Sequence, residues 1–185
     1  MLDKTLPYIE FEMKRPNQLP LPTFPRKLPA GFQLKEYQPG DEASWCAVEY
    51  AVGEFDTLAE AAAYFAKTFA PFPEELSRRM VFITDKTGEI IATCTAWWGK
   101  KGEPLLHWLA VHPSAQKNGL ATFLAVEITR RLATLHPGED LFLHTQTWSY
   151  PAIFLYEKLG YQLLPSTKDF EKGQALLAQL RQAKR

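Results

Sequence analysis

Several residue patterns that define particular classes of protein are scarce in this chain of 185 residues. It has only two cysteines, Cys46 and Cys94, far apart among apolar neighbours. Two such cysteines make neither a disulfide framework nor a zinc cluster, so we expect buried thiols and no metal. Lys plus Arg and Asp plus Glu number 21 each, a formal net charge of +0. Nucleic-acid binding needs an excess of cations, so no nucleic-acid partner is expected.

Long apolar runs are missing as well. No stretch of about 18 apolar residues occurs, so no membrane partner or membrane span is expected. The first residues lack the charged-then-apolar pattern of a secretory signal. Together with the unpaired cysteines, this predicts a cytoplasmic protein. The length and the 46% share of hydrophobic residues fit one globular domain.

Proline sets the first thirty residues apart. Six prolines fall there, at positions 7, 16, 20, 22, 25 and 29. Because proline fixes φ and removes a backbone donor, residues 16–30 are predicted to form neither helix nor central strand. We expect residues 1–30 to be an arm packed on the domain, and a partner-binding proline-rich ligand is the alternative. Within the arm, residues 8–13 alternate apolar and acidic, which predicts an edge strand.

Residues 31–185 are predicted to form one α/β domain with a mixed sheet. Strands are expected at 32–37, 80–84, 89–97, 105–111, 141–146 and 161–164. Helices are expected after Asp41, after the capping box Thr57–Glu60, from Pro73, over 119–135, from Pro151 to Gly160, and in the amphipathic tail 169–185.

The segment between residues 111 and 121 joins a strand to a helix. The start of a helix offers unpaired N–H groups that hold phosphate, and the small residues Gly119 and Ala121 let an anion approach the backbone. The Gly-Lys-Ser/Thr of a Walker loop and the G-x-G-x-x-G of a dinucleotide fold are both missing. What remains is Gln-x-x-Gly-x-Ala after Leu-Ala-Val, which also fits an ordinary strand-helix turn.

A second segment, Ala152 to Tyr161, reads Ala-Ile-Phe-Leu-Tyr-Glu-Lys-Leu-Gly-Tyr. The two segments, in this order and separation, resemble the acetyl-CoA signature and the Leu-Tyr-Glu-Lys-Leu-Gly motif of the GNAT superfamily, the GCN5-related acyl-CoA N-acyltransferases. The resemblance runs from about residue 31 to residue 164 and is specific across 105–161. It implies a mostly antiparallel sheet, splayed between two central strands, with helices on both faces.

The resemblance also implies a cosubstrate, acetyl-CoA, and roles for named residues. Backbone groups of Leu109 and Val111 would bind the pantetheine arm, and Ser149 stands where the family often has Asn. Tyr156 falls on the tyrosine that protonates the departing thiolate. The pyrophosphate would be held by the N–H groups of the loop, from Gln116, Lys117, Asn118, Gly119, Leu120 and Ala121.

Tyr156 and His107 are the predicted catalytic residues. Tyr156 shares a helix face with the small Ala152, and a phenol pKa near 10 is close enough to a thiol pKa near 8.5 for proton donation. His107 is the candidate general base, because related enzymes have a histidine at the corresponding strand position and histidine titrates in the right range. His144 is the second candidate. The alternatives are a core tyrosine, a histidine bonded within the sheet, and water as the base.

The acceptor side is less defined by the sequence. We expect tryptophans 97, 98, 108 and 148 either to line an acceptor pocket or to pack in the core. Glu54 and Asp56 are expected either to attract an ammonium or to form part of a solvated loop. Lys158 and Arg130 meet a CoA phosphate or are solvated. The resulting hypothesis is transfer of an acetyl group to a small-molecule or peptide amine by direct attack. A catalytically idle acyl-CoA sensor is the alternative, and the resemblance allows a homodimer.

Overall fold

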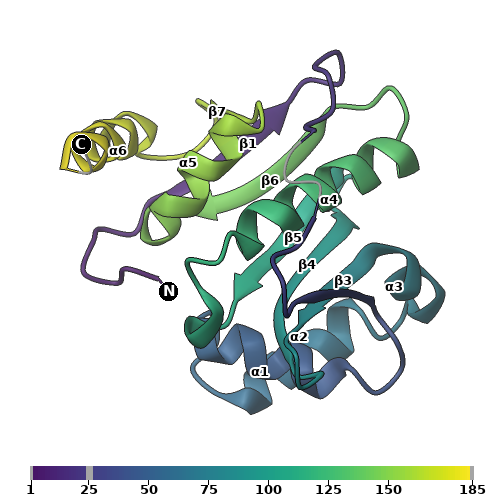
Figure 1. Ribbon diagram of the computed structural model, residues 1–185. Coiled ribbons are helices and arrows are strands. Elements are labelled where there is room, and N and C mark those ends of the chain that lie inside the picture. The colour runs from purple at the N-terminus through teal and green to yellow at the C-terminus, as the bar shows by residue number, and fades with distance from the viewer. Residues whose placement is uncertain (1, 24–26, 184–185) are drawn as a thin grey trace.

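The computed structural model describes residues 2–23 and 27–183, which form one mixed α/β domain. Its seven-stranded sheet has the order β2-β3-β4-β5-β6-β1-β7 and carries helices on both faces (Figure 1). The strands are β1 (Glu10–Arg15), β2 (Gln33–Glu36), β3 (Met80–Thr84), β4 (Ile90–Trp98), β5 (Pro104–Val111), β6 (Leu141–Gln146) and β7 (Gln162–Leu164). The helices are α1 (Glu42–Val52), α2 (Leu58–Thr68), α3 (Pro73–Arg79), α4 (Leu120–Leu135), α5 (Tyr150–Lys158) and α6 (Phe170–Ala183). The predicted fold class is confirmed.

The N-terminal strand corrects one prediction. β1 is not at the edge, because it pairs antiparallel with β6 on one side and with β7 on the other. Phe11, Met13 and Arg15 are buried while the residues between them are less so. An alternating strand has this pattern at the edge or inside a sheet, and only its neighbours decide between the two. Residues 10–15 therefore belong to the sheet and not to an arm laid on it.

The two faces of the sheet bury separate clusters of apolar side chains. Alternate residues of β3 point to opposite faces: Val81 and Ile83 join the cluster of α4 and α5, whereas Met80 and Phe82 join that of α1, α2 and α3. The second cluster is rich in aromatic rings. Trp45 is fully buried there, with its ring centroid 5.4 Å from that of Phe65.

The N-terminal ends of α1 and α2 were each predicted to carry a capping side chain. The capping box of Thr57 and Glu60 is present, each side chain accepting from the other's backbone N–H. Asp41 stands at the N-cap of α1 but makes no capping hydrogen bond to the helix. Its carboxylate accepts from the backbone of Gln38 at 2.8 Å and pairs with Lys35 instead, so that predicted cap is wrong.

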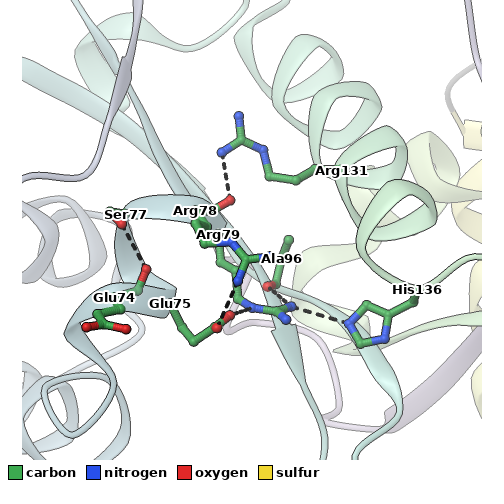
Figure 2. A network of polar contacts seen from close by, with 8 residues as sticks. All are labelled: Glu74, Glu75, Ser77, Arg78, Arg79, Ala96, Arg131 and His136. Carbon is green, nitrogen blue, oxygen red and sulfur yellow. Dashed lines mark hydrogen bonds and ion pairs between the residues drawn. The ribbon is translucent and has the colours of Figure 1, made fainter.

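A buried arginine joins three elements at the end of β4 where β5 begins (Figure 2). Arg79, at the end of α3, is 8% exposed and donates to the Ala96 carbonyl at 3.2 Å and to Glu75 at 2.5 Å. Its guanidinium also lies 3.3 Å from Nε2 of His136, which follows α4. These bonds satisfy the buried charge and hold α3, β4 and the end of α4 together.

The sheet opens between its two central strands. β5 and β6 run parallel and pair only at Leu105 with Phe142 and Leu106 with Leu143. Beyond that point β5 carries an irregularity opposite Cys94, and Trp108 has a φ of 52°, an unusual conformation for a bulky residue. The strands therefore diverge from residue 107 onward, as the splayed sheet was predicted to do. In the described ranges, no helix has both the length and the hydropathy that a membrane span requires.

Candidate active site

The loop that follows β5 is closed by its own side chains. Gln116 Nε2 donates to the Val111 carbonyl at 3.0 Å, and Asn118 Nδ2 donates to the Ala115 carbonyl at 3.1 Å. Lys117 and Gly119 have φ of 66° and 77°, which turn the chain into α4. Gly119 is the N-cap of α4 and supplies no capping side chain. The first N–H groups of α4 therefore have no intrahelical or capping acceptor and can bind an anion.

A cavity of about 320 Å³ lies where β5 and β6 diverge, and one of about 610 Å³ lies beside the loop. We call the larger one the loop cavity and the smaller one the splay cavity. Lys117 and Lys158 line the loop cavity, and no acidic residue of the described chain does. The loop cavity is otherwise lined by Val111, Ala115, Gln116, Gly119, Leu120, Ala121, Thr122, Pro151, Phe154 and Leu155. Its charge and its helix start suit a phosphate-bearing ligand.

The end of β5 presents backbone groups to the opening between the strands. The N–H of His112 donates to the Ile91 carbonyl of β4 at 2.8 Å. Because backbone direction alternates along a strand, Leu109 and Val111 turn their N–H and C=O groups away from β4. On that side β6 has already diverged. An extended chain with amide groups can therefore pair with β5 here as an added strand would.

The splay cavity collects side chains from both sides of the opening. Leu109, Ser149, Ala152 and Tyr156 line its side toward α5, and His107, Trp108 and His144 line it from the two strands. Leu109 and Val111 are two residues apart on β5, and Ala152 and Pro151 are neighbours on α5. The two cavities therefore lie along the same two elements, β5 and α5, and Tyr156 lines the splay cavity.

Tyr156 is 6% exposed and faces this cavity. Within residues 2–23 and 27–183, its hydroxyl has no hydrogen-bond partner. Burial raises the pKa of Tyr156 well above 10, with Cys94 and Tyr161 adding to the effect. The phenol therefore keeps its proton at every physiological pH. The gap to a thiol pKa near 8.5 is wider than the sequence suggested.

His107 lies in the cavity wall as predicted, but its environment opposes the role of a base. Trp108 Nε1 donates to the Tyr64 hydroxyl at 3.1 Å, and this hydroxyl lies 3.1 Å from His107 Nε2. Both hydrogen bonds form when Tyr64 accepts from Trp108 and donates to Nε2 of His107, which then carries its own proton on Nδ1. Burial and the nearby His144 lower the pKa of His107 to about 3. At neutral pH such a ring has little tendency to accept a proton.

Three carboxylates also line the splay cavity: Glu10 on β1, Glu49 on α1 and Glu54 after α1. No Lys or Arg of the described chain lines it. Glu49 is 1% exposed, and its Oε1 has no hydrogen-bond partner among the described residues. Burial raises the pKa of Glu49 well above 4.5, and the charge of Glu54 raises it further.

The other predicted site residues fall into two groups, those that line a cavity and those that make contacts elsewhere. Trp108 lines the splay cavity, whereas Trp97 and Trp98 stack on each other at 4.1 Å and Trp148 donates to the Leu6 carbonyl at 2.7 Å. Lys158 lines the loop cavity, but Arg130 binds the Pro22 carbonyl at 2.7 Å. Asn118 stabilises the loop and is not among the residues lining either cavity.

Glu49 and Tyr64 were missed by the sequence reasoning. A signal for Glu49 existed, because it lies four residues after Trp45 on the stripe of α1 that also carries Val48 and Val52. A carboxylate on a buried stripe is uncommon and indicates a special role. Tyr64 had no such signal, since its contact with His107 joins residues 43 positions apart. Among the described residues, no cluster of His, Cys, Asp and Glu is arranged to hold a metal ion.

Comparison with known proteins agrees with this geometry. Residues 82–169 match the family described as FR47-like protein. Mycothiol acetyltransferase from Acidothermus cellulolyticus is 28% identical over 194 residues, covering 88% of this chain and 54% of that protein. N-alpha-acetyltransferase 60 from Drosophila melanogaster is 40% identical over 57 residues, 30% of this chain and 21% of that protein.

Solved structures share the fold. A GCN5-related N-acetyltransferase from Sphaerobacter thermophilus has a TM-score of 0.66 at 21% identity, covering 85% of this chain and 49% of that one. A tandem GNAT protein from the clavulanic acid biosynthesis pathway has a TM-score of 0.60 at 17% identity, covering 84% and 50%. The chain thus spans about half the length of these relatives, or less. In its splayed sheet, its two motifs and these matches, the chain is similar to the GCN5-related N-acetyltransferases, whose fold it shares.

Proposed function

We propose that the protein transfers an acetyl group from acetyl-CoA to an amine by direct attack of the amine on the thioester. One observation carries this proposal: a cavity lined by lysines and a cavity lined by carboxyl groups lie along the same two elements, β5 and α5, and Tyr156 is in the wall of the second. The loop cavity carries two lysines and suits a polyanionic donor, whereas the splay cavity carries three carboxylates and suits a cationic acceptor. The relatives named above as acetyltransferases support acetyl as the group transferred.

The donor's place follows from the loop and the strand. Its pyrophosphate would bind the N–H groups of residues 116–121 at the start of α4, with Lys117 and Lys158 nearby. The amides of its pantetheine arm would pair with the outward backbone groups of Leu109 and Val111. Ser149 lines the splay cavity and would contact the end of that arm. This path would bring the thioester along β5 and α5 to the splay cavity, beside Tyr156.

Tyr156 would act late in the reaction. Attack forms the new C–N bond, and the C–S bond then breaks, so one proton leaves nitrogen and one must reach sulfur. Tyr156 lines the splay cavity, and its hydroxyl holds its proton and has no hydrogen-bond partner among the described residues. It can therefore donate to the developing thiolate, while water takes the proton that leaves nitrogen and returns one to the tyrosine.

The reaction is tested by following release of free CoA and the acetylated product by mass spectrometry. Purified protein is incubated with acetyl-CoA and a mixed panel of amines. We expect an acetylated amine and an equal amount of CoA, both strongly reduced in Tyr156→Phe. Tight binding of acetyl-CoA without product from any amine would favour the alternative, a catalytically idle acyl-CoA sensor.

A further inference from the structure

Glu49 occupies a position that folding alone does not explain. It lies on the buried stripe of α1 and is 1% exposed, yet its Oε1 has no partner among the described residues. A buried polar atom without a hydrogen bond costs about 1–3 kcal/mol. Native proteins keep few such atoms, and each one calls for a reason. Glu49 therefore costs stability where Leu or Met would pack without penalty.

The unpaired oxygen belongs to a side chain that lines the splay cavity. A molecule that enters the cavity can thus supply the missing partner. The wall offers His107, Trp108 and Tyr156 close to the same space, and it offers no cation of its own. The nearby Lys4 does not serve, since its ammonium lies 5.6 Å over the Trp148 ring, outside the cavity lining.

We propose that Glu49 is the positioning residue for the acceptor, and that the acceptor is a primary alkylamine that is an ammonium ion in solution. This inference rests on the proposed function, because it assigns the splay cavity to the acceptor. The Trp108 indole in the wall can contact the cation or its alkyl part. A cavity of about 320 Å³ lies at the small end of ligand sites. It therefore fits a small amine or the amine-bearing end of a longer one.

Protonation makes this binding mode measurable. Because burial raises the pKa of Glu49, its carboxyl holds a proton more readily than an exposed glutamate does. An arriving ammonium favours the carboxylate form, so binding releases protons to solvent. The bound pair is then an ammonium with a carboxylate or, after transfer between the two, a neutral amine with a carboxylic acid. The neutral amine can attack, and the proton count of Glu49 is unchanged by the acetyl transfer. The other titratable groups around Glu49 come from several elements: Glu10, Glu54, Tyr64, Cys94, His107, His144 and Tyr156, with Lys4 facing Glu54.

The test uses isothermal titration of the full chain, saturated with CoA, with four probes: n-butylamine, n-hexylamine, 1,4-diaminobutane and 2-phenylethylamine. The matching alcohols, n-butanol and n-hexanol, are uncharged controls. Titration in two buffers of different ionisation enthalpy counts the protons released. We expect at least one amine to bind with a net release of protons, and both alcohols to bind far more weakly.

Two variants locate the effect. Glu49→Gln keeps the shape, removes the carboxyl that would pair with the ammonium, and should weaken amine binding about 30-fold or more and abolish proton release. Glu89→Gln removes a carboxyl beside an exposed turn and should alter neither. Unchanged amine affinity in Glu49→Gln, equal binding of alcohols, or no binding by any probe would overturn the inference.

The inference and the proposed function can fail separately. Amines that bind through Glu49 but are never acetylated would refute acyl transfer alone. Amines that are acetylated with an unchanged KM in Glu49→Gln would refute the role of Glu49 alone. Circular dichroism of each variant confirms that the fold is intact before either conclusion is drawn.

Discussion

The Tyr64 hydroxyl lies 3.1 Å from Nε2 of His107, and the same hydroxyl accepts from the Trp108 indole. This contact joins α2 to β5 across the aromatic cluster and occupies the ring nitrogen that a general base would use. The histidine is thereby tied into the wall of the splay cavity. Among the described residues that line the cavity, Tyr156, Glu49 and Thr167 each have a side-chain oxygen without a hydrogen-bond partner.

His107 should remain neutral throughout the physiological range. Its pKa is lowered from 6.5 to about 3, so the unfolded chain binds more protons than the folded one between these values. The stability that this supplies is complete above pH 6.5 and is lost as the pH falls toward 3. Chemical denaturation of wild type and His107→Gln at a series of pH values should show a weaker acid dependence in the variant. An NMR titration of the His107 ring with a midpoint between pH 6 and 7 would contradict this account.

His107→Gln should also leave unchanged the fall of kcat/KM toward acid pH, the acid limb of the activity profile. If His107 were the base, His107→Gln would remove that limb from kcat/KM between pH 6 and 9. We expect the limb to persist, because a group with a pKa near 3 does not titrate there. His144→Gln is the matched control, since it tests the second histidine of the cavity. Loss of the limb in His107→Gln alone would restore the histidine as the base.

Tyr156→Phe should lower turnover by about 10²–10⁴, the usual worth of a positioned acid. The ring and its packing stay, so the fold should survive, and acetyl-CoA affinity should change little because the proton is needed late. Because the pKa of Tyr156 is raised above 10, no alkaline limb from this group should appear below pH 10. The loss of turnover in Tyr156→Phe should be smaller with acyl donors whose leaving thiol is more acidic, because such a thiolate leaves without a proton. Full activity in a folded variant would return the tyrosine to a packing role.

Gly119→Val should abolish CoA binding. The backbone there has a φ of 77°, which a β-branched residue adopts only with strain, and the new side chain would stand over the N–H groups at the start of α4. Gly138→Val is the control, because its φ of 84° imposes similar strain in an exposed turn and nothing lies within 4 Å of either added carbon. Calorimetry with CoA should separate the two variants. Equal CoA affinity in Gly119→Val and wild type would refute the loop as the phosphate site.

Replacing the unpaired carboxylate by an apolar group should stabilise the chain. Glu49→Met fills a similar volume and removes the orphan polar atom, so we expect the free energy of unfolding to rise by about 1–3 kcal/mol. The folded pKa of Glu49 is raised above 4.5, so its contribution to stability is complete below pH 4.5 and is lost as the pH rises through the folded value. The advantage of Met should therefore be larger at pH 8 than at pH 5. Urea denaturation at both values measures it, and a destabilised variant would contradict the argument.

Local signals in the sequence predicted most of the elements. The strand at 141–146, the capping box at Thr57 and the helix after Gly119 follow from short-range chemistry, and the structure confirms them. Placement of β1 between β6 and β7 could not be predicted, because alternation along a strand says nothing of its neighbours. The role of the loop residues at the start of α4 was predicted from the resemblance to a family motif.

The residues that line the splay cavity could not be predicted from local signals in the sequence. Its contacts join residues far apart in sequence, such as Tyr64 with His107 and Glu49 with the space beside Tyr156. The bulge at Trp108, with φ 52°, has no signal in the sequence either. Such features arise only when the helices pack on the sheet.

The most direct test of the account is a crystal structure of the chain with CoA, in which the distance from the CoA sulfur to the Tyr156 hydroxyl oxygen is measured. We predict that the pyrophosphate binds the N–H groups at the start of α4 and that the sulfur lies about 3–4 Å from that hydroxyl, within reach of proton transfer. A sulfur out of reach of the Tyr156 hydroxyl, or a pyrophosphate away from residues 116–121, would contradict the central claim.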